Sequence, residues 1–325
     1  MATEAQAREI NSHAMNAGSY LCPPELLLRA RQHGPAVMAV AAAGAAHVLQ
    51  SVFWAASFGL VEPILVGDPE TIETASRGQD AALSFRIVPA ATEEDAARAA
   101  VGLVASGEAN LLMKGHLHTD VLMRAVLDRA AGLRRSGGRL SHVFAMRWPG
   151  APRDLLITDA ALNVAPDPVT MGHIVRHAIE VAKILRIPHP RIAMLSASET
   201  VNASMPSSMA ASAFVATFRD EAESAGCSIA GPLALDVALS MEAAALKGLG
   251  ADPVAGRADI LVVPNIETGN ALFKALVHLQ HATPIGVVLG ASVPIVLTSR
   301  ADPIEARLAS IALAQLLAPQ DRSAD

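Results

Sequence analysis

The chain has 325 residues, of which 52% are hydrophobic and only 3% are aromatic, and its formal net charge is −6. This length and apolar content suffice for two domains with sizeable cores, packed mainly by alanine, valine, leucine and isoleucine. Lysine and arginine are dispersed except for Arg134, Arg135 and Arg139, so the sequence offers no basic face for nucleic acid. Cys22 and Cys227, the only two cysteines, form no disulfide framework and no ligand-spaced motif, which fits a reducing cytosol.

The N-terminal residues are polar and lack a basic segment followed by an apolar run, so we predict no signal peptide and a cytoplasmic location. Residues 36–61 contain no Asp, Glu, Lys or Arg, a length that resembles a membrane span. Polar or small residues such as Gly44, His47 and Gln50 interrupt this segment. We therefore predict a buried strand, a turn and a helix there, and no membrane span.

Apolar runs typical of strands alternate with helical stretches along the chain. The predicted strands cover residues 36–42, 63–66, 111–113, 155–158, 191–195, 260–263, 285–289 and 295–297. This alternation predicts βαβ units and a mostly parallel sheet, and therefore an α/β fold. In the clearest helix, Asp167 is the expected N-cap, Pro168 occupies the first turn, and Pro188 ends the segment.

Two prolines and a glycine in residues 147–153 interrupt both the helical and the strand periodicity, which indicates a domain crossing. A second crossing is expected within residues 286–294. The predicted domains are residues 1–147 with 291–325, a discontinuous first domain, and residues 148–290. Two such lobes would leave a cleft between them, with Ser299 and Arg300 at its edge.

Two segments near the C-terminus, residues 262–270 and 293–300, are β-branched apolar runs that stop at small polar residues before a helical stretch. In open parallel sheets, ligands bind outside the carboxyl ends of the strands, where helix N-termini favour anions. Arg300 adds a five-donor fork suited to phosphate, and Ser299 can donate a hydrogen bond. Alternatively, Thr298 and Ser299 merely cap the next helix while Arg300 is solvated, and the spacing alone weighs the two interpretations evenly.

Several short motifs form an ordered series along the chain. They are residues 112–115 (LMKG), 158–167 (TDAALNVAPD), 198–202 (SETVN), 231–236 (GPLALD), 247–248 (KG), 254–256 (VAG), 258–261 (ADIL), 290–291 (GA) and the two C-terminal segments. The series resembles the phosphate acetyltransferase and phosphate butyryltransferase family, and more closely its butyryl branch. Each motif alone is weak, whereas their order is specific.

The resemblance implies reversible transfer of a short acyl group between coenzyme A and inorganic phosphate. It also implies a two-lobed α/β/α subunit of the isocitrate/isopropylmalate dehydrogenase type that pairs as a homodimer. No metal or redox cofactor is expected, since coenzyme A is itself a substrate. A butyryl-like preference leaves the acetyl alternative open, because acyl length depends on pocket volume. A homologue that only binds coenzyme A or acyl phosphate is the alternative of another class.

The resemblance also implies roles for particular residues. Ser299 and Arg300 match the family's Ser-Arg pair, in which the arginine would hold the phosphoryl group and the serine would donate to developing charge. The family's Thr-x-x-x-x-Arg motif corresponds to Thr119 and Arg124. The remaining predicted substrate-binding residues are Ser198, Thr200, Asn265, Glu267, Thr268, Gly269 and Asn270.

The sequence departs from the acetyl branch at the base that takes the thiol proton, because Ala306 stands where that branch has an aspartate. Glu305 or Asp302 could replace it, or neither does, and we favour Glu305. A thiol of pKa near ~8.5 is partly ionised at neutral pH, whereas a positioned base is worth ~10² to 10⁴ in rate. His116 and His118 would share one strand face, but no carboxylate or cysteine cluster accompanies them, so no metal site is expected.

Overall fold

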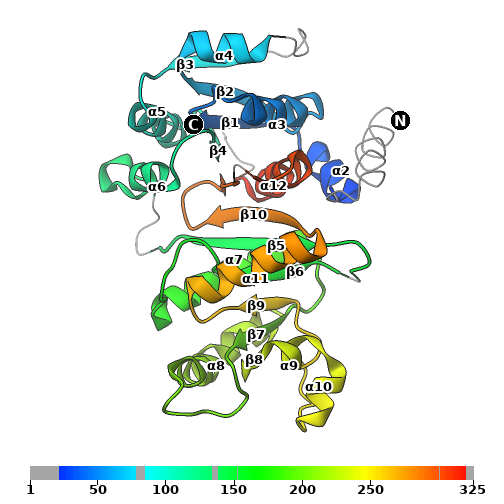
Figure 1. Cartoon of the computed structure of the whole chain (residues 1–325). Coiled ribbons are helices and arrows are strands. Elements are labelled where there is room, and N and C mark those ends of the chain that lie inside the picture. Colours follow the sequence, from blue (N-terminus) through cyan, green and yellow to red (C-terminus); the bar gives the residue numbers. More distant parts are fainter. Residues whose placement is uncertain (1–21, 78–84, 134–137, 152, 300, 320–325) are drawn as a thin grey trace. The chain divides into compact units, whose positions relative to one another are not determined.

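The computed structural model describes residues 22–77, 85–133, 138–151, 153–299 and 301–319 (Figure 1). The described chain forms two compact units, one reaching Gly138 and resuming at Thr283, the other covering Arg139–Ala282. We call them unit 1 and unit 2. The domain boundaries predicted at residues 147/148 and 290/291 stay predictions, because contacts within a compact unit do not by themselves define a folding domain. The two divisions assign the strands Ser141–Arg147 and Thr283–Leu289 differently.

Unit 1 is a mostly parallel sheet with helices packed on it. Its helices are α2 (Pro24–Gln32), α3 (Ala46–Ser57), α4 (Pro69–Ser76), α5 (Glu93–Ala105), α6 (Thr119–Leu127), η1 (Arg129–Ala131) and α12 (Ile304–Leu317). Its strands are β1 (Ala36–Ala41), β2 (Val61–Gly67), β3 (Arg86–Pro89), β4 (Leu111–Lys114), β10 (Thr283–Leu289) and β11 (Ile295–Val296). They lie in the order β3-β2-β1-β4-β11-β10, and only β10 runs antiparallel to its described neighbour in this unit.

The C-terminal helix α12 belongs to the core of unit 1, although 172 residues separate its start at Ile304 from the end of η1 at Ala131. Every residue from Ala306 to Leu316 is buried. It packs against α2, α3 and β10, and Figure 1 shows it beside the blue helices α2 and α3. The uncharged segment 36–61 forms β1 and α3, which confirms the predicted strand and helix. Within the described ranges, no helix is long and apolar enough to cross a membrane.

Unit 2 is also a mostly parallel sheet with helices packed on it. Its strands are β5 (Ser141–Arg147), β6 (Leu155–Thr158), β7 (Arg191–Leu195), β8 (Ser228–Leu233) and β9 (Ile260–Val262). Its helices are α7 (Pro168–Ile184), α8 (Pro206–Ser224), α9 (Leu235–Leu239), α10 (Met241–Leu246) and α11 (Ile266–Gln280). The strand order is β5-β6-β9-β7-β8, and β5 is antiparallel to β6 while the other pairs are parallel.

The structure confirms the α/β class and all eight predicted strands. Helix α7 also begins as predicted, since the Asp167 side chain accepts a hydrogen bond of 2.7 Å from the Thr170 amide and Pro168 is the first helical residue. Three strands were not predicted from the sequence. β3 is a short, half-exposed edge strand, β5 contains Ser141 and His142, and a Gly-Pro pair interrupts β8.

Gly115 follows β4 at a point where the backbone of the β1 end approaches closely. A Cβ atom at this position would lie 2.4 Å from the carbonyl oxygens of both Ala41 and Ala42. Because backbone cannot yield as a flexible side chain does, we predict that Gly115→Ala lowers the free energy of unfolding by about 1–3 kcal/mol. Urea unfolding measures this loss. Gly102→Ala is the matched control, since an added Cβ meets nothing within 4 Å inside α5 and should stabilise by about 0.5–1 kcal/mol.

His142 is a buried histidine of β5, and its two ring nitrogens have no hydrogen-bond partner among the residues that the structure describes. Burial lowers the pKa of its imidazole from 6.5 to about 3, so the ring stays neutral in the folded protein. The unfolded chain binds a proton here below pH ~6.5, whereas the folded chain does not. The stability contributed by neutral His142 is therefore present above pH 6.5 and is lost as the pH falls towards 3.

We predict that His142→Phe removes part of the loss of unfolding free energy on acidification, a loss on the order of 1.4 kcal/mol per pH unit for one such group. Denaturant unfolding between pH 7 and pH 4 measures it. His278→Phe, at an exposed position of α11, serves as the control and should leave the slope unchanged. Equal slopes for the parent and His142→Phe would contradict the assignment.

Candidate functional site

In unit 1 the predicted catalytic residues follow the carboxyl end of β11. This strand is parallel to β4, so the loops after both strands lie at the same edge of the sheet. Ser299 is exposed in the first loop, and Thr119 opens helix α6 after the second. Arg300 lies outside the described residues.

The backbone of Ser299 is held by three hydrogen bonds. Its amide donates to Oδ2 of Asp302 at 2.6 Å. Its carbonyl oxygen accepts from the Asp302 amide at 3.2 Å and from Nη2 of Arg307 at 3.3 Å. Helix α12 begins only at Ile304, with Pro303 as an N-cap that makes no side-chain bond. Neither Thr298 nor Ser299 therefore caps α12, and Oγ of the exposed Ser299 side chain accepts from the Ala301 amide at 3.3 Å. The other half of that alternative, a solvated Arg300, lies outside the described residues.

Asp302 is the acidic group in direct contact with this loop. Burial raises the pKa of its carboxyl group, while the Ser299 amide and the cationic side chains of Arg307 and Lys114 oppose that rise. Both cations are themselves buried, with exposed fractions of 5% and 6%. Glu305 lies in the first turn of α12 and is partly exposed. The structure thus joins Asp302, rather than Glu305, to Ser299 by a hydrogen bond.

Arg124 lies on the exposed face of α6. Its Nη2 is 2.9 Å from Oδ2 of Asp120, and the side chains of both residues are 72% exposed. A surface pair of this kind contributes little to stability, and it leaves the guanidinium within reach of solvent. The prediction that His116 and His118 share a strand face is wrong, because β4 ends at Lys114 and His118 is the N-cap of α6. Among the residues that the structure describes, no three His, Cys, Asp or Glu side chains could hold a metal ion together.

In unit 2 the other predicted substrate-binding residues follow β9 and β7. Asn265 caps helix α11, since its Oδ1 accepts from the Thr268 amide at 2.9 Å and from the Thr268 hydroxyl at 2.6 Å. Gly269 allows α11 to approach the loop after β6, because a Cβ there would lie 2.8 Å from Cα of Ala160. Nδ2 of Asn270 donates to the carbonyl oxygen of Ala160 at 3.4 Å, and Glu267 is exposed.

The loop after β6 is held by Asp159, which is buried. Its carboxylate accepts from the amides of Ala161 and Leu162 at 2.9 and 3.0 Å and from Nδ2 of Asn163 at 2.6 Å. Burial raises the pKa of this carboxyl group, although the hydrogen bonds act in the opposite direction. Asp159 therefore fixes the loop against which Gly269 and Asn270 pack.

Ser198 and Thr200 lie in the loop after β7. The Thr200 amide donates to Oγ of Ser198 at 3.1 Å, so the serine supports a local turn. Between them, Glu199 accepts from the Ala234 amide and lies 3.3 Å from Nζ of Lys247. Both predicted residues thus lie at the same sheet edge as Asn265, because β7 and β9 are parallel.

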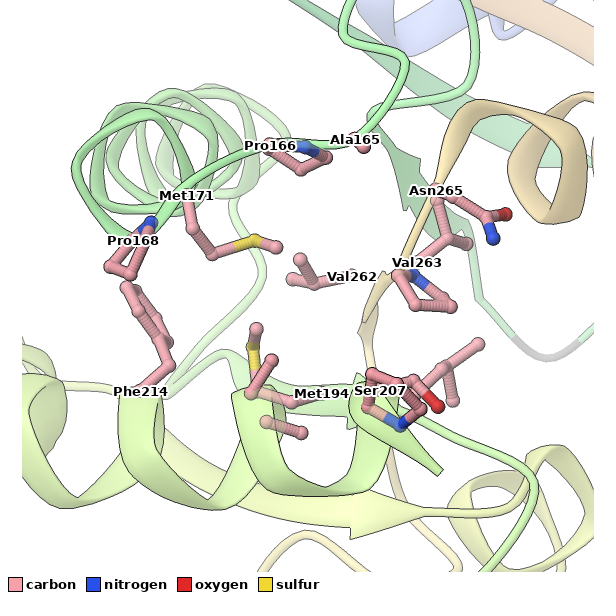
Figure 2. A pocket seen from close by; sticks show the side chains of 15 residues that line it. Ala165, Pro166, Pro168, Met171, Met194, Ser207, Phe214, Val262, Val263 and Asn265 are labelled. Carbon is pink, nitrogen blue, oxygen red and sulfur yellow. The ribbon is translucent and has the colours of Figure 1, made fainter. Parts of the chain in front are cut away.

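An apolar pocket opens at this edge of unit 2, with a volume of about 290 Å³. It is lined by residues of β7 and β9, of α7 and α8, and of the loops that precede α7 and α11. Figure 2 shows the side chains of Met171, Met194 and Phe214 around the cavity, with Asn265 on the side away from Phe214. Ala165 and Pro166, from the motif at 158–167, and residues 262–265, from the first C-terminal segment, complete much of the wall. Two of the family-like motifs therefore meet at one pocket.

Sequence reasoning missed this pocket, and the chain offers only a weak signal for it. Met171 and Phe214 lie on two different helices, and their apolar character resembles that of core residues. Helix prediction alone does not indicate that the two helix starts flank the same pair of strands. The pocket follows from the pairing of β7 with β9.

The chain matches known proteins over most of its length. The family described as "Phosphate acetyl/butaryl transferase" matches residues 75–315. A phosphate acetyltransferase from Rhizobium meliloti is 45% identical over 92% of this chain and 94% of that protein. A phosphate butyryltransferase from Clostridium acetobutylicum is 39% identical over 90% of this chain and 97% of that protein. The crystal structure of a branched-chain phosphotransacylase from Enterococcus faecalis V583 is 36% identical, covers 87% of this chain and 100% of that one, and has a TM-score of 0.75.

The sheet architecture and these matches identify the class as a phosphate acyltransferase. The chain belongs to the phosphate acetyl/butyryl transferase family. It is a transferase that moves an acyl group between coenzyme A and inorganic phosphate, with coenzyme A as a substrate and no further cofactor. Acetyl- and butyryl-transferring relatives are both present, so the family leaves the acyl group open.

Proposed function

We propose that this enzyme prefers a butyryl-like acyl group, and that the apolar pocket of unit 2 binds the acyl chain. One observation carries the proposal: the pocket measures about 290 Å³ and is lined by two methionines, a phenylalanine and two valines. Apolar walls with few polar groups are typical of sites that bind an apolar part of a ligand. An acetyl group offers a single methyl to such a surface, whereas a butyryl group buries two additional methylenes, each worth about 0.8 kcal/mol.

The acetyl preference is the second candidate, and the 45% identity to the Rhizobium meliloti acetyltransferase favours it. Identity over the whole chain reflects the shared fold and reaction as well as the acyl site. The volume of the pocket bears more directly on chain length, which is why we place the butyryl-like preference first.

We further propose that Ser299 and Arg300 act on the phosphoryl group and on the developing negative charge, as the corresponding pair does in the family. Preorganised donors and fixed cations stabilise such charge more than mobile water does. Two acidic residues, Glu305 and Asp302, are the candidates for the base that takes the thiol proton, and the sequence alone favours Glu305. The proposed substrate-binding residues are Arg124, Thr119, Ser198, Thr200, Asn265, Glu267, Thr268, Gly269 and Asn270. A homodimer and a cytoplasmic location belong to the same proposal and rest on the resemblance to the family.

The pocket predicts the order of substrates. With phosphate as acceptor, the kcat/KM for release of free coenzyme A should be higher for butyryl-CoA than for acetyl-CoA. The two additional methylenes should raise it by at least about ten-fold. Acetyl-, propionyl-, butyryl-, valeryl- and hexanoyl-CoA, followed with a thiol reagent, give the series. Ala211→Leu should shift the optimum towards acetyl-CoA, because Ala211 lines the pocket and the larger side chain fills it.

Ala216→Leu is the matched control, since Ala216 lies on the exposed face of the same helix. It should leave the series unchanged. Equal losses for all chain lengths in Ala211→Leu would mean that the pocket binds another part of coenzyme A. If the parent protein bound coenzyme A but released none from any acyl-CoA, the alternative of a non-catalytic binding homologue would replace the proposal.

Arg300→Ala should reduce turnover with phosphate by about 10²–10³-fold, because the variant loses a fixed cation at the phosphoryl group. Initial rates at saturating butyryl-CoA and varied phosphate give the effect, and thermal unfolding checks that the fold persists. Arg129→Ala, an exposed arginine in η1, is the control for loss of one positive charge. Comparable activity in Arg300→Ala would refute the role assigned to Arg300.

A further inference from the structure

The loop that carries Ser299 is built around one carboxylate. Oδ2 of Asp302 accepts the Ser299 amide at 2.6 Å, and the Asp302 amide returns a bond of 3.2 Å to the Ser299 carbonyl oxygen. Ser299 is exposed, whereas Asp302 is partly buried beneath it. The carboxylate therefore contacts the residue whose hydroxyl the family motif assigns to the reaction.

The charged groups around Asp302 come from two elements. The positive charges of Arg307 on α12 and of Lys114 at the end of β4 act on it electrostatically, and both side chains are nearly inaccessible to solvent. Nη1 of Arg307 also donates to the carbonyl oxygen of His47 on α3 at 3.0 Å, which fixes the guanidinium. These cations favour the ionised carboxylate, while burial disfavours it. Asp302 is therefore a carboxylate held between opposing effects, as groups that exchange protons in active sites often are.

Glu305 makes no such hydrogen bond to the Ser299 loop among the described contacts. It lies one turn further along, inside the first turn of α12, and its carboxylate makes no described contact with Ser299. Of the two acidic residues within six positions after Ser299, only Asp302 is joined to it among the contacts that the structure describes.

We propose that Asp302, rather than Glu305, accepts the thiol proton of coenzyme A when acyl phosphate is the acyl donor. This inference rests on the proposed acyl transfer at Ser299. The thiol proton passes to the Asp302 carboxylate, the sulfur lone pair forms the bond to the acyl carbon, and the bond from that carbon to the phosphate oxygen breaks. Phosphate leaves with the electron pair, and the proton on Asp302 passes to water. In the reverse direction, protonated Asp302 returns the proton to the departing thiolate.

The raised pKa of Asp302 agrees with this role, since a base works best when its pKa approaches the working pH. The rate should fall on the acid side as Asp302 becomes protonated. That limb lies above the ordinary pKa of 3.8, because burial shifts the group upwards. The Ser299 amide, Arg307 and Lys114 limit the shift.

The test compares Asp302→Asn, Asp302→Ala and Glu305→Gln in the direction from butyryl phosphate and coenzyme A. Asparagine keeps an oxygen that can accept the Ser299 amide but cannot take a proton at neutral pH. We expect Asp302→Asn to lose about 10²–10⁴-fold in kcat near pH 7. Its rate should then rise with pH towards the thiol pKa of ~8.5, because the ionised thiol needs no base. Glu305→Gln should keep the parent rate and the parent pH profile.

Three results would overturn the inference. Parent-like kcat in Asp302→Asn with a slow Asp302→Ala would make Asp302 a positioning residue that acts only through Ser299. A loss with high-pH recovery in Glu305→Gln instead would return the role to Glu305. Inactivity of the parent with butyryl phosphate would reject the proposed acyl transfer itself, and is recognised because it precedes any substitution. Should Asp302→Asn unfold, Asp302→Glu keeps the carboxylate and must keep the acid limb of the profile.

Discussion

Parallel strand pairing is the constraint on which both units depend. In unit 1, β1, β2, β3, β4 and β11 run in one direction, so every loop that follows them emerges at the same edge of the sheet. In unit 2 the same holds for β6, β9, β7 and β8. Because of this geometry, Lys114 and Asp302 interact although 187 intervening residues separate them in the sequence. Strand direction therefore decides which polar residues lie together at the edge of the sheet where ligands bind.

Buried polar side chains then fix the helix that carries the Ser299 loop. Arg307 donates to the carbonyl oxygens of His47 and Ser299, Ser310 accepts from the Gly286 amide, and Gln315 donates to the carbonyl oxygen of Gly34. Each bond joins α12 to a different part of unit 1. Apolar packing alone would tolerate small rotations of a helix this rich in alanine, whereas unmade buried hydrogen bonds are costly. The position of Ser299 is thereby coupled to the core.

The elements that the sequence predicts correctly are those with a local sequence pattern. Runs of valine, isoleucine and leucine predicted eight strands, and Asp167 with Pro168 predicted the start of α7. β5 was not predicted, because Ser141 and His142 interrupt its apolar sequence, although tertiary packing buries both side chains. β8 was not predicted, because its Gly-Pro pair is typical of a turn. In each case the surrounding layers overrode a local preference.

The site divides in the same way. The helix start at Asn265 and the close backbone approach at Gly269 could be predicted, because both have local sequence signatures. Contact of these two residues with substrate stays a prediction. The pocket of unit 2 could not, since Met171, Met194 and Phe214 come together only after β7 pairs with β9. The choice between Asp302 and Glu305 also required coordinates. Both follow Ser299 within six residues, and only the turn before α12 directs one of them to its amide.

The discontinuity of unit 1 has a consequence for biosynthesis. The ribosome synthesises β1 to α6 early, yet the strands β10 and β11 that complete this sheet and the helix α12 that packs on it emerge only after all of unit 2. During that interval the apolar face of α3 lacks the helix that buries it in the finished protein. Unit 2, whose strands are contiguous in sequence, can assemble first on the nascent chain. The early segment is therefore the part of unit 1 whose apolar surface waits longest for its covering helix during translation.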